Sequence, residues 1–157
     1  MDEIRPSAMV VVCDTNVLIP LIIKASRSVR LFARLEAAGI PVILSPQIKA
    51  EVREKMMTKA TLRKWLNGSD AEIEEFVEQD LPALIRMIPG NEKIEGAVPV
   101  DPKDDMIIAA AIEGGANYIV TQDHHLLDLR EYRAITIMDL EAFGAELDRL
   151  GIASIAN

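Results

Sequence analysis

The sequence predicts an α/β fold, a three-layer α/β/α sandwich in which helices cover both faces of a mainly parallel central sheet. Short apolar runs without polar alternation, which are typical of strands buried on both faces, alternate along the 157 residues with segments of helical periodicity. Half of the residues are hydrophobic but only 4% are aromatic, so we expect an aliphatic core. Because no repeat, low-complexity tract or linker interrupts the chain, we expect a single domain over residues 1–157.

The first half of the chain supplies two expected strands with a helix between them. Residues 9–13 form a short, β-branched apolar run that ends at Asp14. The spacing of leucines and arginines predicts a helix over about residues 25–38, because both residue types recur at helical intervals. The apolar run at residues 40–44 is the second expected strand.

Two helix start signals follow the second expected strand. Ser45-Pro46 pairs an N-cap residue with a proline at the first helical position, and the helix that it opens carries Glu51 nearly two turns in. The segment 69–72, Ser-Asp-Ala-Glu, has the form of a capping box and opens a helix that continues through Leu81. A short strand is expected near residues 94–98.

The second half of the chain repeats the alternation of strand and helix. Asp101-Pro102 precedes a helix over residues 106–113, which a pair of glycines closes. Residues 118–121 and 134–138 are the third and fourth expected strands, and residues 140–150 form a last amphipathic helix. Strands joined by helices run parallel, and in such a sheet the ligand site lies beyond the carboxyl ends of the strands.

Cysteine content and the N-terminus indicate a cytoplasmic protein. A lone Cys13 inside an apolar run excludes an internal disulfide framework and suits a reducing compartment. The first residues carry acids where a signal peptide carries basic residues, and the apolar runs are too short to span a bilayer. We therefore expect no contact with a membrane.

The charge distribution is asymmetric. A formal net charge of −8 disfavours a protein that coats nucleic acid without selectivity, because phosphate affinity normally comes from a positive surface. Residues 24–64 nevertheless carry ten basic residues against three acids. This segment could attract phosphate groups or an acidic protein partner, and a merely solvated helix face explains it equally well.

Four acids, each at or just beyond the junction of an expected strand and helix, are the candidate site. Asp14 and Asp123 follow the ends of expected strands, Asp105 lies in the first turn of a helix, and Glu51 projects from another helix. Alone, each has an ordinary explanation as a turn former, a helix-dipole partner or a surface residue. Together they would converge on one edge of the sheet, where oxygen ligands suit Mg²⁺ or Mn²⁺ and phosphate chemistry.

Polar neighbours of these acids are candidates for a supporting shell. Thr15 and Asn16 follow the first acid directly and could orient its carboxylate, and Thr121 could do the same for Asp123; all three also fit ordinary turns and strand ends. His124 and His125 could be proton shuttles or metal ligands, although a surface loop explains them more simply. No glycine-rich phosphate loop and no serine or cysteine triad is present in the sequence.

Four segments, in order along nearly the whole chain, resemble the PIN-domain nucleases. They read VVVCDTNVL over residues 10–18, LSPQIKAEV over residues 44–52, DPKDDMIIAAA over residues 101–111 and GANYIVTQDHHLL over residues 115–127. Each segment alone is weak, but four in sequence with plausible spacing are specific. The subgroup that they resemble most is the toxin component of type II toxin–antitoxin systems, the VapC-like proteins.

The resemblance implies an α/β/α fold that binds Mg²⁺ or Mn²⁺ and acts as an endoribonuclease on phosphodiester bonds of single-stranded RNA. By position, Asp14, Glu51, Asp105 and Asp123 correspond to the four acids of the family's site. It further implies that Asp14 and Asp105 bind the metal directly and that Asp123 and Glu51 complete the set, directly or through water. Asp104 is close enough to Asp105 to share its role, whereas the two histidines inherit none.

The resemblance also implies protein partners. An antitoxin would cover the site, and the basic stretch from Lys49 to Lys64 could contact either this antitoxin or the substrate. Family members commonly pair, so a homodimer through an amphipathic segment such as residues 71–87 is compatible with the sequence.

Two other classes of function compete with this hypothesis. The alternative on the same fold is a non-catalytic RNA- or protein-binding module, which a degraded acid set would favour; all four acids are present. A phosphatase with an aspartyl nucleophile is disfavoured, because Thr15 and Asn16 follow Asp14 without the second acid that this chemistry uses.

Overall fold

A computed structural model describes residues 8–66 and 68–154 of the chain. These residues form a six-stranded sheet in the order β3-β2-β1-β4-β6-β5. All neighbouring strands are parallel except the edge pair β5 and β6. The strands are β1 (Val11–Cys13), β2 (Val42–Leu44), β3 (Arg86–Met87), β4 (Tyr118–Val120), β5 (Glu131–Tyr132) and β6 (Ile135–Met138).

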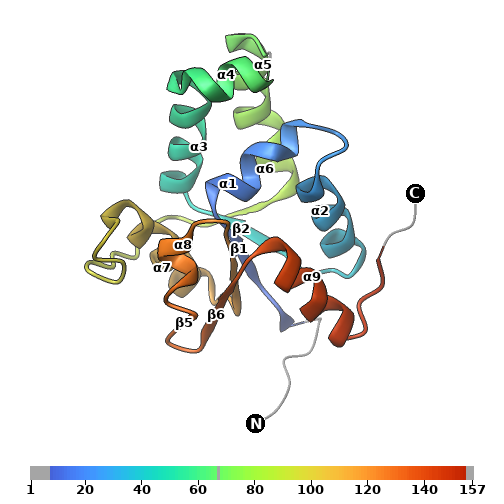
Figure 1. Ribbon diagram of the computed structural model, residues 1–157, viewed down its shortest axis with the longest axis vertical. Helices are drawn as coiled ribbons and strands as arrows, with labels where there is room; N and C mark the ends of the chain where they lie inside the picture. Colours follow the sequence, from blue (N-terminus) through green and yellow to red (C-terminus); the bar gives the residue numbers. More distant parts are fainter. Residues whose placement is uncertain (1–7, 67, 155–157) are drawn as a thin grey trace.

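Helices cover both faces of this sheet, as the sequence predicts. Figure 1 shows α7 on one side of the central strands and the packed pair α2 and α9 on the other. The α-helices are α1 (Thr15–Leu18), α2 (Arg27–Ala37), α3 (Pro46–Thr58), α4 (Ala60–Leu66), α5 (Asp70–Glu75), α6 (Leu81–Leu84), α7 (Asp105–Gly114), α8 (His124–Leu127) and α9 (Leu140–Arg149). Short 3₁₀ segments lie at Ile19–Ile22 and Pro102–Asp104, and a π-helical turn at Phe76–Asp80 joins α5 to α6.

The core consists of aliphatic side chains from the central strands and α7. Val12, Ile107 and Ile119 are fully buried, and Cys13 lies among them. Burial, and secondarily the nearby Asp14 carboxylate, raises the pKa of the Cys13 thiol, so it behaves as a small core residue.

Local signals in the sequence place the helix ends correctly. The Ser45 hydroxyl accepts a hydrogen bond from the backbone N–H of Ile48 at 3.1 Å and begins α3. A capping box between Ser69 and Glu72 begins α5. At the end of α7, a Cβ added to Gly114 would lie 1.8 Å from Ile43 Cδ1, so any larger residue there would require the Ile43 side chain of β2 to shift.

Two expected elements differ from the structure. The amphipathic segment 71–87 is helical only as far as Leu84; Ile85 is extended, and Arg86–Met87 pairs with β2 as an unpredicted edge strand. The short strand expected near residues 94–98 is wrong. Its backbone N–H groups at Gly96 and Val98 donate to the carboxylate of Asp105, so the segment needs no neighbouring strand.

None of the helices in the described part of the chain is long and apolar enough to cross a membrane.

Candidate metal centre

Asp14 lies at the carboxyl end of β1, held by groups from two adjacent strands. Its carboxylate accepts hydrogen bonds from the backbone N–H of Thr15 at 2.6 Å and from the Thr121 hydroxyl, at the end of β4, at 2.8 Å. The same Thr121 oxygen accepts the backbone N–H of Asp123 at 3.0 Å, so one hydroxyl ties the two strand-end acids together. The side chain of Asn16 reaches the other side of this junction and accepts the backbone N–H of Gln122 at 3.1 Å.

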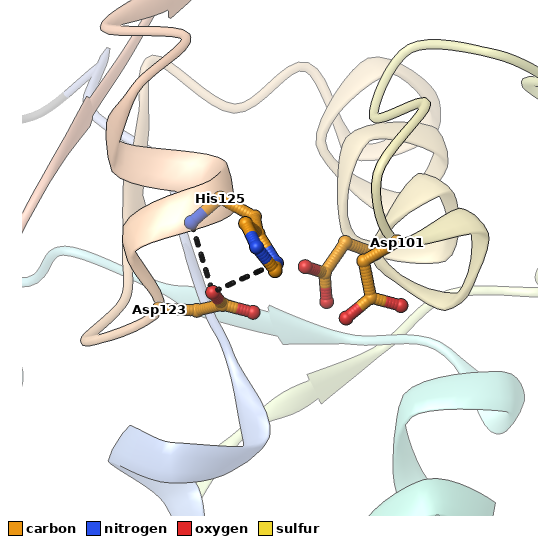
Figure 2. Close-up of side chains that lie close together, drawn as sticks. Asp101, Asp123 and His125 are labelled. Carbon is orange, nitrogen blue, oxygen red and sulfur yellow. Dashed lines mark hydrogen bonds and ion pairs between the residues drawn. The ribbon is translucent and has the colours of Figure 1, made fainter.

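A compact group of four side chains faces this edge of the sheet. Ligand atoms of Asp101, Asp104, Asp123 and His125 all lie within 4.8 Å of one another. Figure 2 shows the His125 ring and the Asp123 carboxylate turned toward Asp101 across the gap between the starts of α8 and α7. The convergence follows from the topology, because β4 and the start of α7 meet beside the end of β1.

Asp105 was expected among the acids, but it does not join this group in the structure. Its two carboxylate oxygens accept the backbone N–H groups of Gly96 at 3.0 Å and Val98 at 2.8 Å. Consecutive residues at a helix start point about 100° apart, so the side chains of Asp104 and Asp105 point in different directions. The 3₁₀ turn at Pro102–Asp104 presents Asp104.

Glu51 lines the cleft beside these acids but does not belong to the four-residue group. It projects from α3, its side chain is 14% exposed, and Lys55 Nζ lies 3.6 Å from its Oε1. The Lys55 ammonium also donates to the Thr15 hydroxyl at 2.8 Å, which links α3 to the loop after β1. Lys59 and Lys103 line this cleft together with the acids, so the cleft contains both ammonium and carboxylate groups.

The electrostatics show acids that repel one another. Burial, chiefly, raises the pKa of Asp14, although hydrogen bonds from Thr121 and Thr15 and the charge of Lys55 oppose the rise. Burial also raises the pKa of Asp104 to about 8, and the hydrogen bond with Asp123 and the charges of Asp14, Asp123 and Asp101 add to it. Asp123 titrates with Asp104. Burial opposes ionisation of Asp123 most strongly. The hydrogen bonds from Asp104 and from the backbone of His125, together with the two histidine side chains, outweigh burial and lower the pKa of Asp123.

These residues fit a divalent cation. Asp104 is only 8% exposed, and its Oδ2 has no hydrogen-bond partner among the described residues. A buried carboxylate oxygen without a donor is costly, and positive charge bound beside it removes that cost. The available donors are mostly carboxylate oxygens, which hard divalent cations prefer.

Sequence reasoning missed one contributor to this site, Asp101, and did not decide the roles of two others, His125 and Lys55. Asp101 is the N-cap of the 3₁₀ turn, as its position suggests, and it also belongs to the four-residue group. The spacing of three between Asp101 and Asp104 was the available signal, because one 3₁₀ turn brings such residues together. His125 and Lys55 had no distinguishing pattern in the sequence.

The fold and the site together define an α/β/α protein with a carboxylate centre at the carboxyl edge of its parallel sheet. A family model described as PIN domain matches residues 10–125. The chain therefore belongs to the PIN domain family, whose members are generally nucleases. The family resemblance and the fold expected from the sequence are thus confirmed.

One solved structure similar to this chain is that of VapBC2 from Rickettsia felis bound to a DNA fragment from their promoter. The match has a TM-score of 0.56 and 15% sequence identity, and it covers 83% of this chain and 98% of that chain. At this level of identity the likeness concerns the fold. A comparison with curated proteins found no match.

Proposed function

We propose that this protein is a metal-dependent endoribonuclease that hydrolyses phosphodiester bonds of single-stranded RNA. The observation that carries the proposal is the buried Asp104 carboxylate, which has an oxygen without a donor and lies among acids in a cleft lined with lysines. Such a cleft suits a phosphodiester only when a cation offsets the acids, because the carboxylates alone repel phosphate.

Asp104 and Asp123 would hold Mg²⁺ or Mn²⁺ directly, and Asp14 and Glu51 would complete the set directly or through water. When bound, the cation supplies positive charge that stabilises phosphate oxygens and makes water more acidic. Asp104 takes the place that the sequence suggested for Asp105. Asp105 instead holds the backbone of Gly96 and Val98, and so fixes the start of α7 on which Asp104 lies.

The remaining side chains orient the acids and attract substrate. Thr15 and Thr121 hold the Asp14 carboxylate at fixed angles, which keeps its remaining lone pairs directed into the cleft. Lys55, Lys59 and Lys103 can attract the phosphates of a strand that crosses the acids. Lys55 also screens the charge of Asp14, which favours its ionised, metal-binding form.

We further propose that the protein is the toxin of a toxin–antitoxin pair, acting in the cytoplasm as one nuclease domain. Support comes from its segment-by-segment resemblance to VapC-like proteins and from the VapBC2 structure that shares its fold. An antitoxin would then be its protein partner, covering the acidic cleft.

Cleavage of a fluorogenic single-stranded RNA with Mn²⁺, Mg²⁺ or EDTA tests the proposal. Wild type should cut with metal and not with EDTA, and Asp14→Asn made identically should not cut. Asp128→Asn is the matched control, because Asp128 is exposed and lies outside the cleft, and it should cut like wild type. Metal binding without cleavage of the RNA tested would indicate a narrow substrate specificity, and the absence of both cleavage and metal binding would support the non-catalytic binding module instead.

A further inference from the structure

The four-residue group contains a nitrogen donor that an all-oxygen magnesium site does not have. We propose that His125 binds the metal directly, so that Asp101, Asp104, Asp123 and His125 form a mixed nitrogen and oxygen site that favours Mn²⁺ and similar transition-metal ions over Mg²⁺. This inference rests on the proposed function, because it concerns the same metal centre.

Two short segments build the site. Asp101 and Asp104 lie one 3₁₀ turn apart before α7, where residues three apart lie above one another. Asp123 and His125 lie at the start of α8, and the Asp123 carboxylate accepts the backbone N–H of His125 at 2.9 Å. That bond fixes the backbone of His125, and the Nδ1 of its ring lies 3.7 Å from the same carboxylate (Figure 2).

An independent observation indicates that a cation belongs there. Asp104 is more than nine-tenths buried, and its Oδ2 has no hydrogen-bond donor in the described chain. The other three side chains of the site, Asp101, Asp123 and His125, donate no hydrogen bond to that oxygen. A bound cation is the partner that this geometry leaves room for.

The adjacent histidine provides a contrast. The side chain of His124 is 78% exposed and that of His125 only 31% exposed. Although the two rings are 4.2 Å apart between centroids, only His125 has a ring nitrogen within the 4.8 Å group. His124 therefore serves as the matched control for any variant of His125.

The chemistry of the donor determines which ion is favoured. Imidazole nitrogen suits first-row transition metals, whereas Mg²⁺ prefers oxygen ligands and retains much of its water. Three carboxylates with one imidazole should therefore bind Mn²⁺ more tightly than Mg²⁺. Removal of the imidazole should lower the affinity for Mn²⁺ more than that for Mg²⁺.

The test uses the full chain with Mn²⁺ alone, without RNA. Pulsed electron paramagnetic resonance detects a directly coordinated nitrogen on Mn²⁺, and calorimetry gives the affinities for Mn²⁺ and Mg²⁺. We expect a nitrogen signal in wild type and in His124→Ala, and its loss in His125→Ala. The Mn²⁺ affinity of His125→Ala should fall roughly tenfold or more, which is the scale seen when a supporting partner of a metal ligand is lost.

The wild-type spectrum alone can overturn the inference, whatever happens to the folding of a variant. Mn²⁺ that binds without a coordinated nitrogen, or a nitrogen signal that persists in His125→Ala, would contradict the role of His125 and leave the carboxylate centre standing. Failure of wild type to bind Mn²⁺ at all would contradict this inference and the proposed metal centre together.

Discussion

Two groups of carboxylates lie on or beside α7, and their hydrogen-bond partners differ. In the first group, Asp105 accepts two backbone N–H groups, and Glu113 accepts those of Gly90, Asn91 and Glu92. In the cleft, Asp104 has an oxygen without a donor and a pKa raised to about 8. Backbone N–H groups of the chain itself donate hydrogen bonds to the carboxylates of the first group. The second group lacks enough donors, which is the arrangement expected of acids that bind a cation from solution.

The contrast is sharpest between neighbours. Asp104 and Asp105 are adjacent in the sequence, are both aspartates and are both 8% exposed. The Asp105 carboxylate stabilises a loop through hydrogen bonds, whereas the carboxylate of the adjacent Asp104 is repelled by the neighbouring acids. Substituting each aspartate in turn therefore distinguishes a structural role from a metal-binding role.

The largest expected effect is on catalysis. Asp104→Asn should lower metal-dependent RNA cleavage by a factor on the order of 10² to 10³, because it removes a charged ligand of the cation that stabilises the reacting phosphate. Asp105→Asn should keep most of the activity, since its side chain faces away from the cleft. The kcat/KM of both variants with Mn²⁺ measures the difference, and equal losses would break the distinction between the two acids.

The next effect is on stability in the absence of metal. Asp105→Ala should lower the free energy of unfolding by roughly 1–3 kcal/mol, because it leaves two backbone N–H groups without a partner. Asp104→Asn should raise the melting temperature in EDTA, since it removes a repelling charge. Thermal and urea unfolding in EDTA measure both changes. A lower melting temperature for Asp104→Asn would argue against repulsion in the cluster.

The free energy of unfolding of the metal-free protein should depend on pH because of Asp104. Its pKa is raised in the folded state from 3.8 to about 8, so the folded protein holds a proton that the unfolded chain releases. Without metal, this residue therefore destabilises the fold progressively as pH rises from about 4 to about 8, and its effect is absent below that range. The difference between the unfolding curves of wild type and Asp104→Asn across pH isolates the contribution, and a difference that stays constant with pH would refute it.

The smallest expected effect concerns Glu113, whose side chain is at the surface. Hydrogen bonds from the backbone of Glu92 and Gly90, above all, lower its pKa, so its stabilising effect is present above about pH 4.5 and is lost as pH falls through its lowered pKa. Glu113→Gln should change the melting temperature little. It should speed hydrogen exchange at the amides of residues 90–92, and unchanged exchange there would show that the carboxylate does not hold this loop.

Much of the fold follows from local patterns in the sequence. The four expected strands are present because short apolar runs between helices have no other way to bury both faces. Ser45 and Ser69 begin helices as their capping patterns predict. The strand Arg86–Met87 could not be predicted, because two exposed residues carry no alternation and depend on pairing with β2.

The site was predictable only in part, for a geometric reason. Asp14 and Asp123 follow strands, and parallel strands bring their carboxyl ends together whatever the details. Whether Asp104 or Asp105 faces the cleft depends on a single 3₁₀ turn. It also depends on which backbone N–H groups of the preceding loop need a carboxylate as hydrogen-bond acceptor. His125 and Asp101 depend on the distance between two helix starts, which is a tertiary property.

Calorimetric titration of Mn²⁺ into wild type, Asp104→Asn and Asp105→Asn tests most directly whether a cation supplies the partner that the cleft lacks. We predict that Asp105→Asn binds Mn²⁺ with nearly the affinity of wild type and that Asp104→Asn binds it far more weakly. Undiminished binding by Asp104→Asn, with binding lost in Asp105→Asn, would contradict the assignment and return the metal centre to the position that the sequence alone suggested.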